Sequence, residues 1–350
     1  MIKTHTILLS LLLFLPFTQA KNPSHKKDAF LYEYPQFYKF RGEMNRKTHQ
    51  NYDVWIDDLR PASGVIRKFV SEELKINPDV TIWVNQFNKT YPEKLLLLHL
   101  NGEARQINDF PKVSSCYFPG HWVYEPGGML LDNCNLQQTT IRVENIQLFK
   151  EKKYANRNKN PIEWISTYVI LVKLDKQGNR LWYESEIVHV KRIDFQTGTL
   201  TVERGKSNSR PRSFTAGETY VAPIAGGIWG GDVMFYYNLS SACPKDKNGK
   251  TSADIFIDEI ASWFSPKGAL KSLDGIAFDV NYFSITKNPD WDVNNDGTAD
   301  GGIVNGKNIW REGDWQFLKS LRNKMGKDFI ITGDGQHAEN QQAVGILNGI

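Results

Sequence analysis

Short hydrophobic runs alternate with amphipathic runs along much of the chain, a pattern typical of parallel strands connected by helices. In the first part the predicted order is strand, helix, strand and helix, at residues 53–56, 62–74, 81–84 and 91–100. An initial strand is predicted at 37–40 and a further short strand at 121–125. After Pro223 the alternation returns, with strands predicted at 232–238, 273–280, 328–332 and 343–347 and helices at 253–264 and 315–324.

The pattern is different between these two parts, because residues 138–224 alternate polar and apolar positions without a helical period. The segments Asp175-Lys-Gln-Gly178 and Thr197-Gly198 are turn sequences that separate such strands. We therefore predict that residues 130–222 form an all-β module, inserted in a loop of an α/β domain that comprises residues 29–129 and 223–350. The module is either structural or an accessory that contacts a substrate.

The octapeptide Leu273-Asp-Gly-Ile-Ala-Phe-Asp-Val280 is the most informative segment. As a strand of period two, it places Gly275, Ala277 and Asp279 on one face and large apolar residues on the other. This division suits a strand of a (β/α)8 TIM-type barrel, with Asp279 at the C-terminal end, where such enzymes hold their catalytic residues. Asp279 is a candidate for catalysis or substrate contact. The alternative is an Asp that caps the following turn.

Several other predicted strands also end in polar residues, and in a barrel these C-terminal ends converge on one rim. Hydrolysis of a glycosidic bond needs two carboxyl groups, for which Asp279 is the first candidate, Glu125 the second and Asp334 the third. Aromatic side chains near the rim can stack on sugar rings. The predicted substrate-binding residues are Trp83, Asn85, Trp122, Tyr237, Asn238, Trp291 and Asn348. Asp274 lies at the opposite end of its strand, and we expect it to cap that strand.

The loop from Asp292 to Asp300 carries oxygen-bearing residues at alternate positions around Gly297, as calcium-binding loops do. Its twelfth position is Ile303 rather than Glu, so a calcium ion would need a further ligand, such as Asp290. The predicted metal ligands are Asp292, Asn294, Asp296, Thr298 and Asp300. The alternative is an acidic, glycine-rich loop that contacts substrate. No cofactor is required, and structural calcium is the metal that the spacing predicts.

The N-terminal segment, the net charge and the cysteines indicate which kinds of protein this chain can be. Residues 1–20 combine an apolar run with small residues, as in a secretory signal peptide, so we expect a secreted, periplasmic or extracellular protein without a membrane anchor after cleavage. The net charge of +4 is spread along the chain, which does not favour a nucleic-acid partner. Cys116 and Cys134 form either a single bridge or buried thiols. The sequence has no Gly-rich phosphate loop and no Gly-x-Ser-x-Gly segment, which disfavours phosphoryl transfer and serine hydrolysis.

Four segments carry a resemblance to a known family: Leu273-Asp-Gly-Ile-Ala-Phe-Asp279, residues 292–302, Ile330-Ile-Thr-Gly-Asp-Gly335 and Gly345-Ile-Leu-Asn-Gly-Ile350. They resemble secreted TIM-barrel glycoside hydrolases that are distantly similar to endo-α-1,4-polygalactosaminidases. The resemblance covers roughly residues 29–129 and 223–350. It implies that Asp279 is a catalytic carboxylate and that a second acidic residue is due after Ile350. We therefore expect a (β/α)8 barrel that is C-terminally incomplete.

These observations predict a secreted glycoside hydrolase that cleaves a polysaccharide or oligosaccharide with paired carboxylates. One alternative is a non-catalytic carbohydrate-binding protein on the same scaffold, and another is an extracellular structural protein, because a fold does not fix a function. An enzyme needs two carboxyl groups that face one cleft, whereas a binding protein needs only aromatic and amide side chains.

Overall fold

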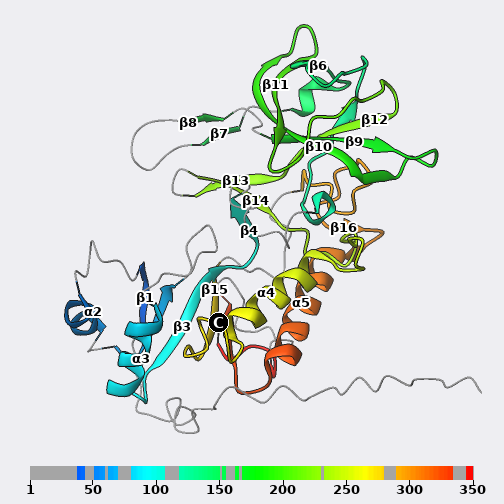
Figure 1. The fold of residues 1–350 in the computed structure, drawn as a ribbon. Helices are drawn as coiled ribbons and strands as arrows, with labels where there is room; N and C mark the ends of the chain where they lie inside the picture. Colours follow the sequence, from blue (N-terminus) through cyan, green and yellow to red (C-terminus); the bar gives the residue numbers. More distant parts are fainter. Residues whose placement is uncertain are drawn as a thin grey trace, which may run out of the picture.

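The computed structural model describes residues 38–43, 51–59, 62–69, 80–106, 118–149, 152–154, 162–164, 168–229, 232–279, 289–333 and 344–349. Five parallel strands form one sheet, in which they follow one another in chain order (Figure 1). They are β1 (Tyr38–Glu43), β2 (Gly64–Lys68), β3 (Leu95–Asn101), β15 (Gly275–Asp279) and β18 (Ile330–Gly333). This order differs from that of a doubly wound sheet, where the strand order reverses at a switch point.

Four helices pack on one face of this sheet. They are α2 (Tyr52–Leu59), α3 (Val80–Thr90), α4 (Ser252–Phe264) and α5 (Ile309–Met325). Their buried aromatic residues, such as Trp55 and Phe317, share one core with Leu96, Leu98 and Phe278 of the sheet. The opposite face carries a smaller cluster of Leu95, Leu97, Ala277 and Ile330. Successive residues of β3 and β15 therefore alternate between a helix-covered face and a second face, as pleated strands require.

Local sequence explains where α4 and α5 begin. Thr251 and Asp254 form a capping box, in which the Thr251 hydroxyl accepts from the Asp254 amide and the Asp254 carboxylate accepts from the Thr251 amide. At α5, the Asn308 side chain accepts from the Arg311 amide at 2.8 Å. The predicted helices in this part of the chain are confirmed, as are the predicted strands that contain β15 and β18.

In the first part of the chain the predicted alternation is correct but its phase is wrong. The structure has α2, β2, α3 and β3 where the pattern predicts a strand, a helix, a strand and a helix. The Leu95–Leu98 run is buried on both faces of a parallel sheet, so it shows no period of two and resembles a helix in composition. Trp55 and Ile56 of α2 and Trp83 of α3 pack into the core from amphipathic helices, and this packing overrides their strand propensity.

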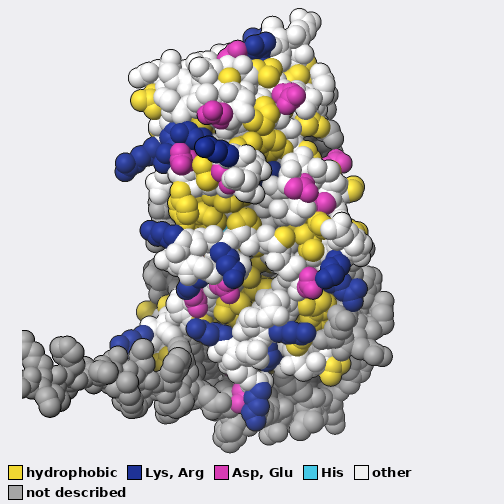
Figure 2. Space-filling model, turned by 90° about the vertical axis from the view of Figure 1, so that its right-hand side faces the viewer, with side chains coloured by type: hydrophobic (Ala, Val, Ile, Leu, Met, Phe, Trp, Pro, Cys, Tyr) yellow, Lys and Arg dark blue, Asp and Glu magenta, His cyan; other side chains and the backbone are white. Residues whose placement is uncertain are grey.

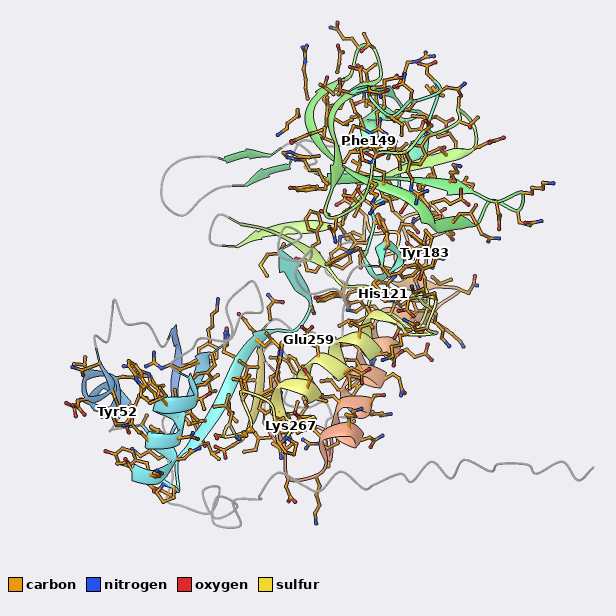
Figure 3. The ribbon with its side chains drawn as sticks, in the orientation of Figure 1. Tyr52, His121, Phe149, Tyr183, Glu259 and Lys267 are labelled. Carbon is orange, nitrogen blue, oxygen red and sulfur yellow. The ribbon has the colours of Figure 1, made fainter. Side chains whose placement is uncertain are left out.

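The antiparallel sheet predicted for the middle of the chain closes on itself. Its strands, in spatial order, are β5 (Gly128–Met129), β12 (Thr219–Pro223), β9 (Tyr168–Leu174), β10 (Arg180–Asp194), β11 (Thr199–Lys206) and β6 (Thr140–Arg142). The Glu144 amide donates to the Met129 carbonyl, and the Leu131 amide donates to the Arg142 carbonyl, so the two edges are joined. Closure leaves no free sheet edge. Figure 3 places the buried Phe149 within this β module.

A buried ion pair organises one end of the β module. Arg204 donates two hydrogen bonds to Glu186, at 2.8 and 2.6 Å, and both side chains are almost fully buried. Arg204 also contacts the Cys134 sulfur at 3.1 Å. Cys134 is a free, buried thiol, so the bridge considered for Cys116 and Cys134 is not formed, and Cys116 lies outside the described residues.

A third, three-stranded sheet connects these parts (Figure 1). It contains β13 (Gly226–Trp229), β14 (Asp232–Tyr236) and β4 (Ala104–Gln106), which continues the chain directly after β3. The predicted strand at 121–125 is a 3-10 turn, Pro119–His121, followed by isolated bridges from Trp122 to Tyr237 and from Tyr124 to Ile224. Shorter elements are β7 (Lys152–Tyr154), β8 (Ile162–Trp164), β16 (Ile303–Val304), β17 (Lys307–Asn308) and a 3-10 turn at Ile146–Leu148.

Residues 344–346 form a turn, so the strand predicted at 343–347 is wrong in its described part. The chain nevertheless runs beside β18 two residues later, where Gly349 makes a parallel bridge to Thr332. Across the described ranges, no helix combines the length and apolar character needed to cross a membrane.

Candidate active site

Asp279 and His99 meet at the C-terminal end of the parallel sheet. The strand register pairs Ala277 with His99 and Asp279 with Asn101, so the two side chains lie on the same face of adjacent strands. The distance from His99 Nε2 to Asp279 Oδ2 is 3.4 Å. The Asp279 side chain is 16% exposed, whereas that of His99 is 2% exposed. A carboxylate that solvent can reach is thus backed by a buried imidazole.

The ring of Phe40 in β1 lies against His99, with ring centroids 5.3 Å apart and planes at 84°. Phe40 itself is 47% exposed. Among the described residues, Nδ1 of His99 has no hydrogen-bond partner. Among the described residues, the Phe40 ring and the Asp279 carboxylate are thus two neighbours of the imidazole.

The junction of β3 and β4 forms the neighbouring part of this strand end. The Asn101 side chain accepts from the amides of Glu103 and Ala104, at 3.0 and 2.9 Å, and holds a tight turn. The Gly102 amide donates to the Asp279 carbonyl at 2.9 Å. Glu103 is only 1% exposed, and its carbonyl accepts from the Tyr237 amide. Glu103, a second carboxyl-bearing residue, thus directly follows Gly102, whose amide is hydrogen-bonded to the end of β15.

Asp274 confirms its predicted structural role at the other end of β15. Its carboxylate accepts from the Leu96 amide at 2.8 Å, its own amide donates to the Leu96 carbonyl, and its carbonyl accepts from the Ile330 amide. Asp274 thus ties three strands together. The two acidic residues of the octapeptide therefore differ in environment. The Asp274 carboxylate takes part in the hydrogen bonds of the sheet, whereas Asp279 lies at the C-terminal edge.

The predicted aromatic substrate-binding residues are core residues. Trp83, Trp122, Tyr237 and Trp291 are between 2% and 6% exposed. Trp122 stacks on Tyr237 with centroids 5.1 Å apart, and Trp291 packs on Tyr236. In this structure these side chains pack in the core, and their role in sugar stacking stays a prediction.

The predicted polar residues of the rim fasten chain segments to one another. Asn85 lies on the exposed side of α3, because the strand predicted there is a helix, and it accepts from the Ser272 hydroxyl. Asn238 is fully buried, donates to the Val293 carbonyl and accepts from Ser240. Asn348 accepts from Arg322 and from the Ile331 amide. Because Ser272 precedes β15, Asn85 lies near the opposite end of that strand from Asp279, contrary to the prediction that both line one rim.

Of the two other predicted carboxylates, Glu125 and Asp334, the structure describes only Glu125. Glu125 is 6% exposed, and its amide donates to the Pro223 carbonyl, so its backbone belongs to the segment beside the β module rather than to the parallel sheet. Asp334 lies outside the described residues.

The loop predicted to bind calcium is closed by its own backbone and by an arginine. Asp292 accepts from Arg180 at 2.5 Å and from the Gly297 amide at 3.0 Å. The Asp296 carboxylate accepts from the Thr298 amide, and Asp300 accepts from the amides of Val293 and Asn294. Asn294 accepts from the Asp296 amide, and the side chain of Thr298 is exposed. Within the described ranges, no group of three or more His, Cys, Asp or Glu side chains is arranged around a common point.

Burial raises the pKa of Asp292, and the neighbouring Arg180 guanidinium opposes this increase. The guanidinium therefore supplies the positive charge that the loop was expected to obtain from a metal ion. The oxygen-bearing residues lie in one loop around Gly297, as the spacing predicts, and calcium binding by this loop stays a prediction.

His99, Phe40, Glu103 and Arg180 are the residues of these sites that the sequence pattern did not identify. The available signal was the sequence His99-Leu-Asn-Gly-Glu103, which follows a hydrophobic run just as Asp279 does. It was hidden because that run was interpreted as a helix. Arg180 and Asp292 are 112 residues apart, so no local pattern connects them.

No protein-family model matches the chain. No curated protein matches it. Among solved structures, the chain is similar to the crystal structure of pyruvate kinase from Pyrobaculum aerophilum, with a TM-score of 0.28 and 11% identity, over 86% of this chain and 48% of that chain. The chain thus spans about half the length of that structure. At this TM-score the similarity defines neither the fold nor an activity.

Proposed function

We propose that the protein is a secreted glycoside hydrolase in which Asp279 is a catalytic carboxyl group. The observation that carries this proposal is the position of Asp279, which ends a parallel strand on its small-residue face and is partly exposed beside His99. A carboxylate in such a position can transfer a proton or attack a sugar carbon. The substrate class is a polysaccharide or oligosaccharide.

The arrangement of the parallel sheet and its helices also supports this proposal. Five parallel strands in chain order, with helices on one face, are what an arc of a (β/α)8 barrel contains, and we infer that these strands belong to such a barrel. Barrel enzymes place their chemistry at the C-terminal strand ends, where Asp279 lies. Figure 2 shows Lys and Arg side chains interspersed with Asp and Glu over the described part of one face, a pattern that does not favour a nucleic-acid partner.

A glycoside hydrolase needs a second carboxyl group, about 5–5.5 Å away in retaining enzymes and about 6.5–9.5 Å away in inverting enzymes. Glu103 joins Glu125 and Asp334 as a candidate, because its backbone is attached to the end of β15 through Gly102. Glu103→Gln, Glu125→Gln and Asp334→Asn variants would each be assayed. The variant whose turnover falls as far as that of Asp279→Asn identifies the partner of Asp279.

The decisive experiment compares Asp279→Asn with wild type, using the full-length protein and a panel of neutral and amino-sugar polysaccharides. Release of reducing sugar should fall by about two to four orders of magnitude if Asp279 acts in proton transfer, and by more if it is the nucleophile. Asp274→Asn is the matched control. Asp274 lies at the opposite end of the same strand, where its carboxylate accepts a hydrogen bond from the Leu96 amide. Wild-type turnover by Asp279→Asn would exclude the proposed role, and glycan binding without turnover by the wild type would favour the carbohydrate-binding alternative.

A further inference from the structure

We propose that His99 is a positioning residue, which holds the Asp279 carboxylate in place through a proton on Nε2. The significance for catalysis rests on the proposed function of Asp279, whereas the contact can be tested without any substrate. Nε2 and Oδ2 are 3.4 Å apart on adjacent strands whose register is fixed by the sheet. Closure of this distance by a few tenths of an ångström gives an ordinary N–H···O hydrogen bond.

Because the His99 imidazole is buried, its contact with Asp279 matters more than it would at an exposed position. The His99 side chain is 2% exposed, and within the described part of the chain neither ring nitrogen has a hydrogen-bond partner that satisfies full geometric criteria. A buried imidazole without a partner is unfavourable, and Asp279 Oδ2 is the acceptor that lies beside it. The Phe40 ring meets the imidazole edge-on, which limits rotation away from Asp279.

The other described histidines have different partners. Nε2 of His121 lies 2.9 Å from the Lys250 carbonyl, so that ring is bound to backbone. His189 lies on the β module, stacks on Tyr168 and has Nδ1 3.7 Å from the exposed Glu203. Only His99, among the described histidines, combines burial with a carboxylate at the C-terminal end of the parallel sheet. His189 and Glu203 therefore provide a matched control pair.

The contact is tested by long-range proton–nitrogen NMR on the full-length protein with labelled histidine, at a pH where the imidazoles are neutral. The wild type should show His99 protonated at Nε2. The Asp279→Ala variant should shift the resonances of both ring nitrogens of His99. Glu203→Ala should move those of His189 and leave those of His99 in place. Unchanged His99 resonances in Asp279→Ala would overturn the proposal, whatever the activity.

The positioning role is tested with His99→Gln, which keeps an N–H donor near the place of Nε2, and His99→Leu, which does not. We expect kcat to fall about 100-fold in His99→Leu, as for other small displacements of a catalytic group, and to recover partly in His99→Gln. Equal kcat in His99→Leu and wild type would overturn the positioning role while leaving Asp279 as the catalytic group. If no glycan is turned over by the wild type, the proposed function fails and the resonance test still decides the contact.

Discussion

Arg180 of the β module and Asp292 of the loop that follows β15 form a buried ion pair, with Nη2 and Oδ2 2.5 Å apart. Their side chains are 5% and 0% exposed. The guanidinium also lies over the rings of Tyr220, Tyr124 and Trp182, at 4.7, 5.7 and 5.6 Å. Since the Asp292 amide donates to the Tyr124 carbonyl, this one residue connects the loop to both the β module and the segment before it.

Replacing Arg180 with Met should lower the free energy of unfolding by about 3–5 kcal/mol, because it leaves a buried carboxylate without its cation. The double variant Arg180→Met with Asp292→Asn should recover part of this loss, since no uncompensated charge then remains. Urea unfolding measures both. Arg142→Met is the control, because the Arg142–Asp132 pair is about half exposed and should contribute little. An Arg180→Met protein as stable as the control would show that the ion pair does not hold the module to the loop.

Calcium is the second test of this loop. Because Arg180 already pairs with Asp292, and backbone amides bind the other carboxylates, we expect millimolar calcium to leave the melting temperature of the metal-stripped wild type unchanged. A ligand that binds the folded state alone must raise that temperature. A calcium-dependent increase would support the calcium prediction, with displacement of Arg180 as the structural change to look for.

The contrast between β3 and β15 shows what the sequence could predict. In β15 the small residues Gly275 and Ala277 alternate with Ile276 and Phe278, so strand, faces and end were all predictable. In β3 the Leu residues are large on both faces, because Leu96 and Leu98 pack on the helices and Leu95 and Leu97 on the opposite cluster. Periodicity was absent there, and strand and helix could not be distinguished from composition.

The same ambiguity between strand and helix limited which residues of the candidate site could be predicted. Asp279 was predictable because its strand was recognised, whereas His99 and Glu103 follow a run that was assigned to a helix. The predicted aromatic residues are ambiguous for a different reason. A Trp near a strand end can either stack on a sugar ring or pack in the core. The packing of Trp122 on Tyr237 places Trp122 in the core.

Gly275→Ala tests the close approach of β15 and β18. A methyl group at Gly275 would lie 2.0 Å from the Ile330 carbonyl oxygen, so the two strands would have to separate. We expect a loss of at least about 1–3 kcal/mol in the free energy of unfolding, as for other overpacked sites. Gly178→Ala is the comparison, because its methyl group would meet nothing within 4 Å and its cost is the positive φ of 85° alone, about 1–2 kcal/mol. Unaltered stability of Gly275→Ala would mean that these strands are not packed this closely.

His121 should make stability depend on pH near neutrality. It lies between the β module and α4 (Figure 3), and burial lowers its pKa below the ordinary value of 6.5, against the opposing effects of the Lys250 carbonyl, Asp246 and Asp254. The unfolded chain therefore binds a proton, at pH values just below 6.5, that the folded protein does not bind. The stabilising contribution of neutral His121 is complete above pH 6.5 and is lost as the pH falls toward the lowered pKa.

The variant His121→Gln isolates this effect, because an amide nitrogen can still donate to the Lys250 carbonyl but does not titrate. Between pH 7.5 and 5.5, the wild type should lose stability more steeply than His121→Gln, with a difference in slope of at most about 1.4 kcal/mol per pH unit, the limit for one proton. His189→Gln should give a smaller difference, since burial also lowers the pKa of His189 but that side chain is 25% exposed. Urea unfolding at each pH measures the slopes. Identical slopes for wild type and His121→Gln would show that His121 binds its proton equally well in the folded and unfolded protein, and would contradict the prediction.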